Sequence, residues 1–235
     1  MGEYGFVAER YARVLEGIGA AAARSGRRPE EVSLLAVTKF HPLEAVEAAY
    51  AAGARLFGEN RVQEAEAKYP AFLAAHADAR LEMIGHLQSN KARKAPGLFS
   101  RVQSVDSVEL LAELDRRAAA AGLRLELLFE LRTGEDSKSG FAGLDELWAA
   151  CEAAAGMASA VPRGLMTMAP LASDPAPVRA AFRRLRSALE EAARRFAFPG
   201  FDVLSMGMSG DYELAVEEGS TLVRVGTAIF GERRA

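Results

Sequence analysis

Short apolar runs alternate with amphipathic stretches along most of the chain. The apolar runs are rich in Val, Leu, Ile and Phe and have the length of buried strands. We expect strands over residues 32–39, 55–60, 81–86, 101–105, 124–131, 160–166, 201–206 and 222–230. Between them, apolar side chains recur at helical spacing, which predicts helices over residues 43–52, 62–76, 90–95, 108–121, 144–155, 177–196 and 212–218. Gly53, Gly122 and Gly219 stand where three of these helices should end, because glycine adopts positive φ easily.

Regular alternation of strand and helix implies parallel strands joined by right-handed crossovers. Eight strands in 235 residues favour an α/β fold consisting of a single closed (β/α)8 barrel, a TIM barrel. The rival is a doubly wound open sheet, which usually has fewer strands and a glycine-rich turn after the first one. The first turn here, TKFHP at residues 38–42, contains no glycine. We therefore expect residues 1–235 to form one domain, with an additional amphipathic helix within residues 1–30 packed on the barrel.

The composition fits a protein with a sizeable core and narrows the range of partners. Half of the residues are hydrophobic, the formal net charge is −3, and the arginines are dispersed, so we expect no nucleic-acid binding. No signal peptide and no bilayer-spanning apolar run are visible, so we expect no membrane association. The single cysteine, Cys151, excludes an intramolecular disulfide and suits a reducing compartment. These features predict a cytoplasmic protein.

Lys39 follows directly on the apolar run VSLLAVT at residues 32–38, and Pro42 opens the next helix. Burial at such a strand end disfavours the charged form of lysine and lowers its pKa. A neutral amine is what imine formation with a carbonyl compound or pyridoxal phosphate requires. The alternative is a lysine whose stem covers apolar surface while its ammonium group reaches solvent. This segment alone leaves both interpretations open.

Two turns near the end of the chain have the composition of a phosphate site. In TIM barrels the loops after strands seven and eight often hold phosphate. Ser209 and Gly210 follow the seventh expected strand, and Gly226 and Thr227 lie in the eighth segment, so both turns offer hydroxyl and free N–H groups. The alternative for Ser209 is a simple helix cap.

Arg224 and Asn60 are the other two candidate site residues. Arg224 lies within the eighth strand, where an inward guanidinium could donate to a pyridine nitrogen. An ion pair of Arg224 with Glu130 or Glu59 is the alternative. Asn60 ends the second strand and could bond a cofactor hydroxyl or cap the next helix.

The remaining polar and sulfur-containing residues carry weaker signals. His41 and His86 lie near strand ends and could reach a site there, but no His, Cys, Asp and Glu set has metal-ligand spacing. We therefore expect no bound metal. Four methionines cluster at strand ends and are most simply an adaptable apolar lining: Met166, Met168, Met206 and Met208.

Eight segments of the chain resemble the pyridoxal phosphate homeostasis proteins, relatives of the N-terminal barrel of alanine racemase. They are LLAVTKFHP (34–42), FGENRVQE (57–64), IGHLQSNK (84–91), QSVDS (103–107), GEDSKSG (134–140), RGLMTMAP (163–170), LSMGMSGD (204–211) and GSTLVRVGTAIFG (219–231). The resemblance runs nearly end to end and keeps the order of the motifs. It implies a (β/α)8 barrel that binds pyridoxal phosphate as an aldimine on Lys39, with its phosphate on the four turn residues named above. Arg224 would then face the pyridine nitrogen, and Asn60 would lie along the ring.

One departure from the family pattern falls at the end of the fifth strand. The family usually has Val-Asn there, whereas this chain has Glu130 and Leu131. Loss of the asparagine removes a polar group near the barrel mouth and leaves the polar contacts around strand five open.

The resemblance favours a cofactor carrier or buffer with no catalytic residues and no established turnover. Its partners would be pyridoxal phosphate and pyridoxal phosphate-dependent apo-enzymes, and we expect a monomer, with a dimer as the alternative. A racemase-like enzyme is the second hypothesis. It needs a second base opposite Lys39, which alanine racemase takes from an additional β-domain and which only Tyr212, His86 or His41 could supply here. A cofactor-free, Schiff-base-forming aldolase is the third hypothesis, and it leaves the phosphate turns unexplained unless its substrate is a sugar phosphate.

Overall fold

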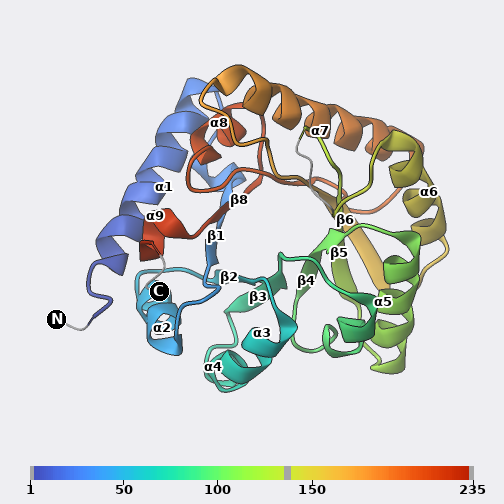
Figure 1. Cartoon of the computed structure of the whole chain (residues 1–235), viewed down its shortest axis with the longest axis horizontal. Helices are drawn as coiled ribbons and strands as arrows, with labels where there is room; N and C mark the ends of the chain where they lie inside the picture. Colours follow the sequence, from blue (N-terminus) through green and yellow to red (C-terminus); the bar gives the residue numbers. More distant parts are fainter. Residues whose placement is uncertain (1–2, 135–138, 233–235) are drawn as a thin grey trace.

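The computed structural model of the chain describes residues 3–134 and 139–232, and residues 135–138 of the GEDSKSG motif lie outside these ranges. Within them, eight parallel strands close into a barrel in sequence order (Figure 1). The ring is complete because β1 pairs in parallel with both β2 and β8. The strands are β1 (Ser33–Val37), β2 (Leu56–Glu59), β3 (Arg80–Met83), β4 (Arg101–Val105), β5 (Leu125–Glu130), β6 (Ala160–Met166), β7 (Val203–Ser205) and β8 (Leu222–Val225). The predicted (β/α)8 fold class is confirmed.

Helices surround the barrel and cover its outer face (Figure 1). They are α1 (Val7–Arg24), α2 (Leu43–Ala51), α3 (Val62–Lys68), α4 (Pro70–Ala75), α5 (Val108–Ala120), α6 (Leu144–Ala155), α7 (Pro175–Arg195), α8 (Tyr212–Glu217) and α9 (Thr227–Phe230), with 3-10 turns η1 (Pro29–Glu31) and η2 (Ser89–Lys94). The additional N-terminal helix is confirmed: α1 lies outside the barrel against α2, α8 and α9. No helix of residues 3–134 and 139–232 has both the length and the apolarity needed to cross a membrane.

The structure differs from the predicted elements in several places. The third strand ends at Met83 and not at residue 86, the seventh spans only Val203–Ser205, and the helix predicted over 90–95 is the 3-10 turn η2. The helix predicted over 62–76 is divided into α3 and α4, because Pro70 has no N–H and its ring clashes with the preceding turn. The last strand ends at Val225, and residues 227–230 form the short helix α9 instead. A short apolar run does not by itself separate strand from helix, and this one buries Ile229 and Phe230 as a helix. The first strand ends at Val37, so Lys39 stands in the turn after it.

The barrel interior is separate from the main core between strands and helices. Leu35 and Val37 on β1 form a small apolar cluster with Leu222, whereas Leu34 and Ala36 belong to the large outer core. This division follows from the alternation of side chains along a strand. The interior also holds buried polar side chains from four strands, namely Glu82, Gln103, Ser205 and Arg224. The inside of this barrel is therefore partly polar.

Candidate cofactor site

A cavity of about 240 Å³ lies at the carboxyl ends of the strands. Its walls come from the segments that follow β1, β2, β7 and β8, together with residues near the ends of β3 and β6. All seven residues predicted for the site line it: Lys39, Asn60, Ser209, Gly210, Arg224, Gly226 and Thr227. The fold therefore brings together in one cavity residues that are up to 188 positions apart (227 − 39).

Part of the cavity wall is apolar and formed by sulfur-containing side chains. Met166, Met168 and Met208 line it together with Ile84. Met206, which we expected beside them, is instead fully buried in the outer core, so that part of the prediction is wrong. Side chains alternate along the β7 segment, which turns Met206 away from the cavity. The remaining methionines give an adaptable surface of the kind that accommodates a flat ring.

The turns after β7 and β8 are joined by one hydroxyl group. Ser209 Oγ accepts hydrogen bonds from the backbone N–H groups of Gly226 (3.3 Å) and Ala228 (3.2 Å). The helix-cap alternative for Ser209 is wrong, because Asp211 precedes α8 and no side chain caps that helix. A Cβ atom added at Gly210 would meet no atom within 4 Å, so the backbone there is open. Turns that combine hydroxyl groups with open glycine backbone in this way favour an anion.

Arg224 is almost completely buried, with 5% of its surface exposed. Its Nη1 donates to Ser205 Oγ (2.7 Å) and its Nη2 donates to the Thr167 carbonyl oxygen (2.9 Å). The alternative ion pairs are not formed: in the part of the chain that the structure describes, no carboxylate lies within 4 Å of Arg224, and Glu59 pairs with Lys68 (2.6 Å). Burial lowers the pKa of Arg224 to about 10, so the guanidinium stays charged at neutral pH. Since a guanidinium has five N–H donors, others are left for the cavity.

Lys39 lies in a turn whose backbone is held on both sides. The preceding carbonyl, that of Thr38, accepts from Lys68 Nζ at 2.9 Å. The following residue, Phe40, has φ of 66° and donates its N–H to Glu64 Oε1 at 2.5 Å. A positive φ is uncommon outside glycine and such strain is concentrated at functional sites. The local structure therefore fixes where the Lys39 side chain starts.

Asn60 lies at the edge of the cavity and does not cap the next helix. The residue that precedes α3 is Arg61, and its side chain makes no capping bond. Gly85 packs against Asn60 so closely that a Cβ atom there would be 2.5 Å from the Asn60 carbonyl oxygen. Asn60 is thus held by backbone contact and is one of the residues that line the cavity.

The candidates for a second base lie outside the residues that line the cavity. The His41 ring contacts Phe230, with 5.0 Å between ring centroids. His86 Nδ1 lies 3.0 Å from an Asp106 carboxylate oxygen, beside a separate cavity. The Tyr212 hydroxyl packs against Gly17 of α1.

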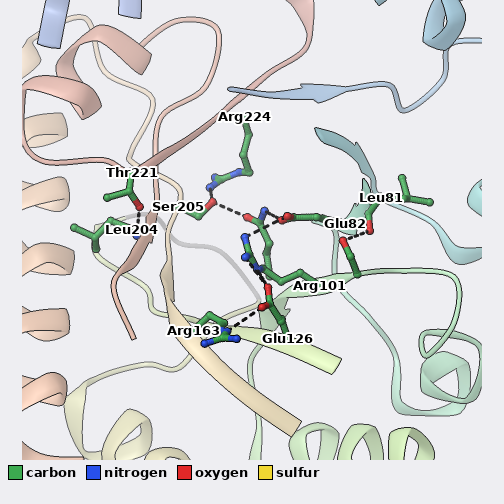
Figure 2. Close-up of polar contacts among 11 residues, drawn as sticks. Leu81, Glu82, Arg101, Glu126, Arg163, Leu204, Ser205, Thr221 and Arg224 are labelled. Atoms are coloured by element: carbon green, nitrogen blue, oxygen red, sulfur yellow. Dashed lines mark hydrogen bonds and ion pairs between the residues drawn. The ribbon is translucent and has the colours of Figure 1, made fainter. Parts of the chain in front are cut away.

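Sequence reasoning missed the polar residues beneath Arg224. Ser205, Gln103, Glu82 and Arg101 continue from Arg224 across the interior as a chain of hydrogen bonds (Figure 2). The available signal was a charged residue, Glu82, between Leu81 and Met83 in an apolar strand. A lone carboxylate inside a strand needs a buried partner, and that partner comes from another strand.

The fold and the cavity define a class: a parallel barrel with a lysine after its first strand and hydroxyl-bearing, glycine-containing turns after its last two strands. The family model described as alanine racemase, N-terminal domain, matches residues 18–234. The chain is 37% identical over 228 residues to the pyridoxal phosphate homeostasis protein of Aquifex aeolicus, covering 96% of this chain and 98% of the relative. It is 42% identical over 230 residues to the protein of that name from Pseudomonas aeruginosa, covering 97% and 96%.

Solved structures of related proteins have the same fold as this chain. PipY of Synechococcus elongatus with pyridoxal phosphate bound is 40% identical, with a TM-score of 0.83, covering 96% of this chain and 100% of that chain. Alanine racemase from Corynebacterium glutamicum shares the fold at 19% identity and a TM-score of 0.72, with 96% and 61% covered. The chain belongs to the pyridoxal phosphate homeostasis protein family.

Proposed function

We propose that this chain binds pyridoxal phosphate in the 240 Å³ cavity, attached covalently at Lys39 Nζ, and carries and buffers the cofactor. The observation that supports this most is the convergence of the seven site residues on one cavity. The PipY relative was solved with pyridoxal phosphate, and curated relatives are named for its homeostasis. A cytoplasmic location and a monomeric state remain predictions from the sequence.

The cavity residues match the chemical groups of pyridoxal phosphate. The hydroxyl and N–H groups of the β7 and β8 turns suit the phosphate, with Ser209 and Gly210 on one side and Gly226 and Thr227 on the other. Arg224 can donate to the ring nitrogen, and Lys39 supplies the amine. When bound, the cofactor supplies an aldehyde that condenses with an amine and a ring that withdraws electrons. Arginine keeps its own proton, so the ring would stay neutral and withdraw electrons weakly.

The groups around the cavity support a carrier over a racemase. Racemisation needs a base on each face of the substrate carbon. The ionisable side chains among the described cavity residues are Lys39 and Arg224, and Arg224 cannot act as a base at neutral pH. The chain would hold the cofactor, shield it in an apolar setting and release it. Deuterium exchange at the α-carbon of alanine in D2O tests this: rapid exchange that depends on Lys39 would contradict the carrier proposal.

Covalent binding is tested by the absorption spectrum. Protein mixed with pyridoxal phosphate should turn yellow, and borohydride reduction followed by peptide mapping should place the adduct on Lys39. Lys39→Ala should lose the adduct and retain the cofactor more weakly by about tenfold or more, with the residual binding coming from the phosphate turns. Lys91→Ala is the matched control, since Lys91 lines a separate cavity. A protein that stays colourless, or one reduced only at other lysines, would favour a cofactor-free function such as an aldolase.

Delivery needs its own experiment. Loaded protein is mixed with a pyridoxal phosphate-dependent apo-enzyme, and the rate at which activity appears is compared with the rate of release into buffer. Activation faster than free release supports direct transfer to the apo-enzyme. If the apo-enzyme is activated only as fast as the cofactor is released into buffer, the protein acts as a buffer of free cofactor and does not transfer it directly.

A further inference from the structure

A chain of buried hydrogen bonds crosses the barrel from the cofactor cavity towards the opposite end (Figure 2). Arg224 Nη1 donates to Ser205 Oγ at 2.7 Å, and Ser205 Oγ donates to Gln103 Oε1 at 2.5 Å. Gln103 Nε2 donates to Glu82 Oε2 at 2.5 Å, and Glu82 Oε1 accepts from Arg101 at 3.2 Å. The chain joins β8, β7, β4 and β3 through side chains that are at least 95% buried at its first four positions.

The direction of every bond in this chain is determined by its two ends. Because an arginine side chain only donates hydrogen bonds, Ser205 Oγ accepts from Arg224. Its single hydroxyl proton is then donated to Gln103 Oε1. At the other end, Glu82 accepts from two donors, Arg101 Nη1 at one oxygen and the NH2 group of Gln103 at the other. The amide of Gln103 is therefore oriented with its oxygen towards Ser205. If the amide were turned over, Gln103 Oε1 would face Glu82 Oε2, and two buried acceptor oxygens without a proton between them would destabilise the fold.

The carboxylate at the far end is itself firmly held. Arg101 bonds both Glu82 and Glu126, reaching Glu126 through Nε (3.1 Å) and Nη2 (2.7 Å). Arg163 Nε donates to the other Glu126 oxygen at 2.9 Å. Figure 2 shows these ion pairs below the Ser205 and Arg224 side chains. The series of hydrogen bonds that starts at Arg224 thus ends at the ion pairs of Arg101, Glu126 and Arg163. These ion pairs hold the Glu82 end of the series in place.

Arg224 has two anchors, and they come from different elements. Nη2 is bound to the Thr167 carbonyl oxygen after β6, and Nη1 is bound to Ser205 on β7. Two contacts fix the plane of a guanidinium, whereas one leaves it free to swivel about the remaining bond. Among the described residues, Ser205 is the one that connects Arg224 to Gln103, so the orientation of Gln103 is transmitted through that hydroxyl.

We propose that Gln103 is a positioning residue that, through Ser205, fixes the direction in which Arg224 offers its N–H groups to the ring nitrogen of the cofactor. This inference rests on the proposed function. Gln103 is not among the described residues that line the cavity, and its contribution is the orientation of the Ser205 hydroxyl.

The test compares Gln103→Met, which keeps the length of the side chain and removes both hydrogen bonds, with Ser205→Ala. Both variants should still form the borohydride-trapped adduct on Lys39, shift the absorption maximum of the bound cofactor in the same direction, and release it roughly two- to tenfold faster. The double variant should match Ser205→Ala, because Gln103 acts through Ser205. Ser220→Ala is the control: its buried hydroxyl bonds three backbone carbonyls and does not touch Arg224.

A cofactor analogue with carbon in place of the ring nitrogen separates positioning from a general loss of structure. Wild-type protein and Gln103→Met should release this analogue at the same rate. A difference that persists with the analogue, an equal change in Ser220→Ala, or an unchanged spectrum in both Gln103→Met and Ser205→Ala would overturn the inference. Wild-type protein that bound no pyridoxal phosphate would instead overturn the proposed function and the inference with it.

Discussion

Glu130 is a buried carboxyl group at the mouth of the barrel. It ends β5 with 4% of its surface exposed, and Ser139 Oγ donates to it at 3.1 Å. Burial raises the pKa of Glu130, and the Ser139 bond and the charge of Arg224 reduce that rise without cancelling it. Leu131 beside it is fully buried and pairs its backbone N–H with Met166. A buried carboxyl group, that of Glu130, thus lies next to the Leu131 position, where the sequence predicted the loss of a polar group.

This raised pKa makes a prediction about stability and pH. A carboxyl group whose folded pKa is raised stabilises the fold below its ordinary value of about 4.3, and this contribution is lost as pH rises through the folded pKa. Glu130→Gln cannot ionise. It should therefore match the wild type near pH 4 and become progressively more stable than the wild type towards pH 7.5. Urea unfolding at several pH values measures the difference.

Glu113 provides the opposite case as a control. Hydrogen bonds from Arg116 and Arg117 lower the pKa of this surface carboxyl group. Glu113→Gln should therefore lose a little stability at neutral pH and none at acid pH. If Glu130→Gln were destabilising at pH 7.5, the burial cost assigned to Glu130 would be wrong.

At the scale of elements, the pairing of β6 with β7 depends on a glycine. Gly164 has φ of 151° and pairs with Val203 next to an irregularity in the β5–β6 register. A Cβ atom at Gly164 would lie 2.0 Å from the Val203 carbonyl oxygen, so the strands would have to separate. Gly164→Ala should cost about 3 kcal/mol or more in unfolding free energy, measured by urea denaturation.

Gly143→Ala is the matched control for this substitution. Gly143 precedes α6, its φ of −162° is accessible to any residue, and a Cβ atom there meets nothing within 4 Å. Its replacement should change stability by less than about 0.5 kcal/mol. Equal effects of the two substitutions would show that the contact with Val203 is not what limits position 164.

Much of the element order and most of the cavity could be predicted from the sequence, because both depend on local patterns. β4, β6 and α6 have the bounds that the pattern predicted. The seven predicted site residues line one cavity because parallel strands end at a common face. α9 was missed since its four residues are equally compatible with the end of a strand. The bond between Ser205 and Gln103 joins residues 102 positions apart and depends on the stagger of β4 and β7. No local pattern contains that information.

In the whole molecule, α1 and the residues just after it connect the N-terminal part of the chain to its C-terminal part, near the point where β1 pairs with β8. Arg24 near its end pairs with Glu213 (2.8 Å) and Glu217 (2.6 Å) of α8. Arg27, just after it, donates to the carbonyl oxygens of Val216 (2.9 Å) and Ser220 (2.8 Å). These contacts connect the N-terminal helix to the segment that leads into β8, next to the β1–β8 pairing. We therefore expect the barrel and α1 to unfold together as one domain.

Cys151 offers a direct measurement of that cooperativity. Its side chain on α6 is fully buried in the core, and burial raises the pKa of the thiol to about 12. The native thiol should therefore resist alkylation, and iodoacetamide should modify it only when the protein opens. Where refolding outpaces alkylation, the rate of labelling reports the free energy of opening. Mass spectrometry follows this single cysteine without interference from other thiols.

Binding at the distant cofactor cavity should then slow this reaction, because a ligand that binds only the folded state adds to its stability. Pyridoxal phosphate at about 100 times its dissociation constant adds about 2.7 kcal/mol, which corresponds to roughly hundredfold slower labelling if opening is global. In Lys39→Ala the same concentration should protect much less, and pyridoxal without its phosphate should protect weakly in both proteins. Labelling that is rapid in the native state, or insensitive to the cofactor while the cofactor is demonstrably bound, would mean that α6 opens on its own. The barrel would then not behave as the single cooperative unit that its closed sheet and its N-terminal helix predict.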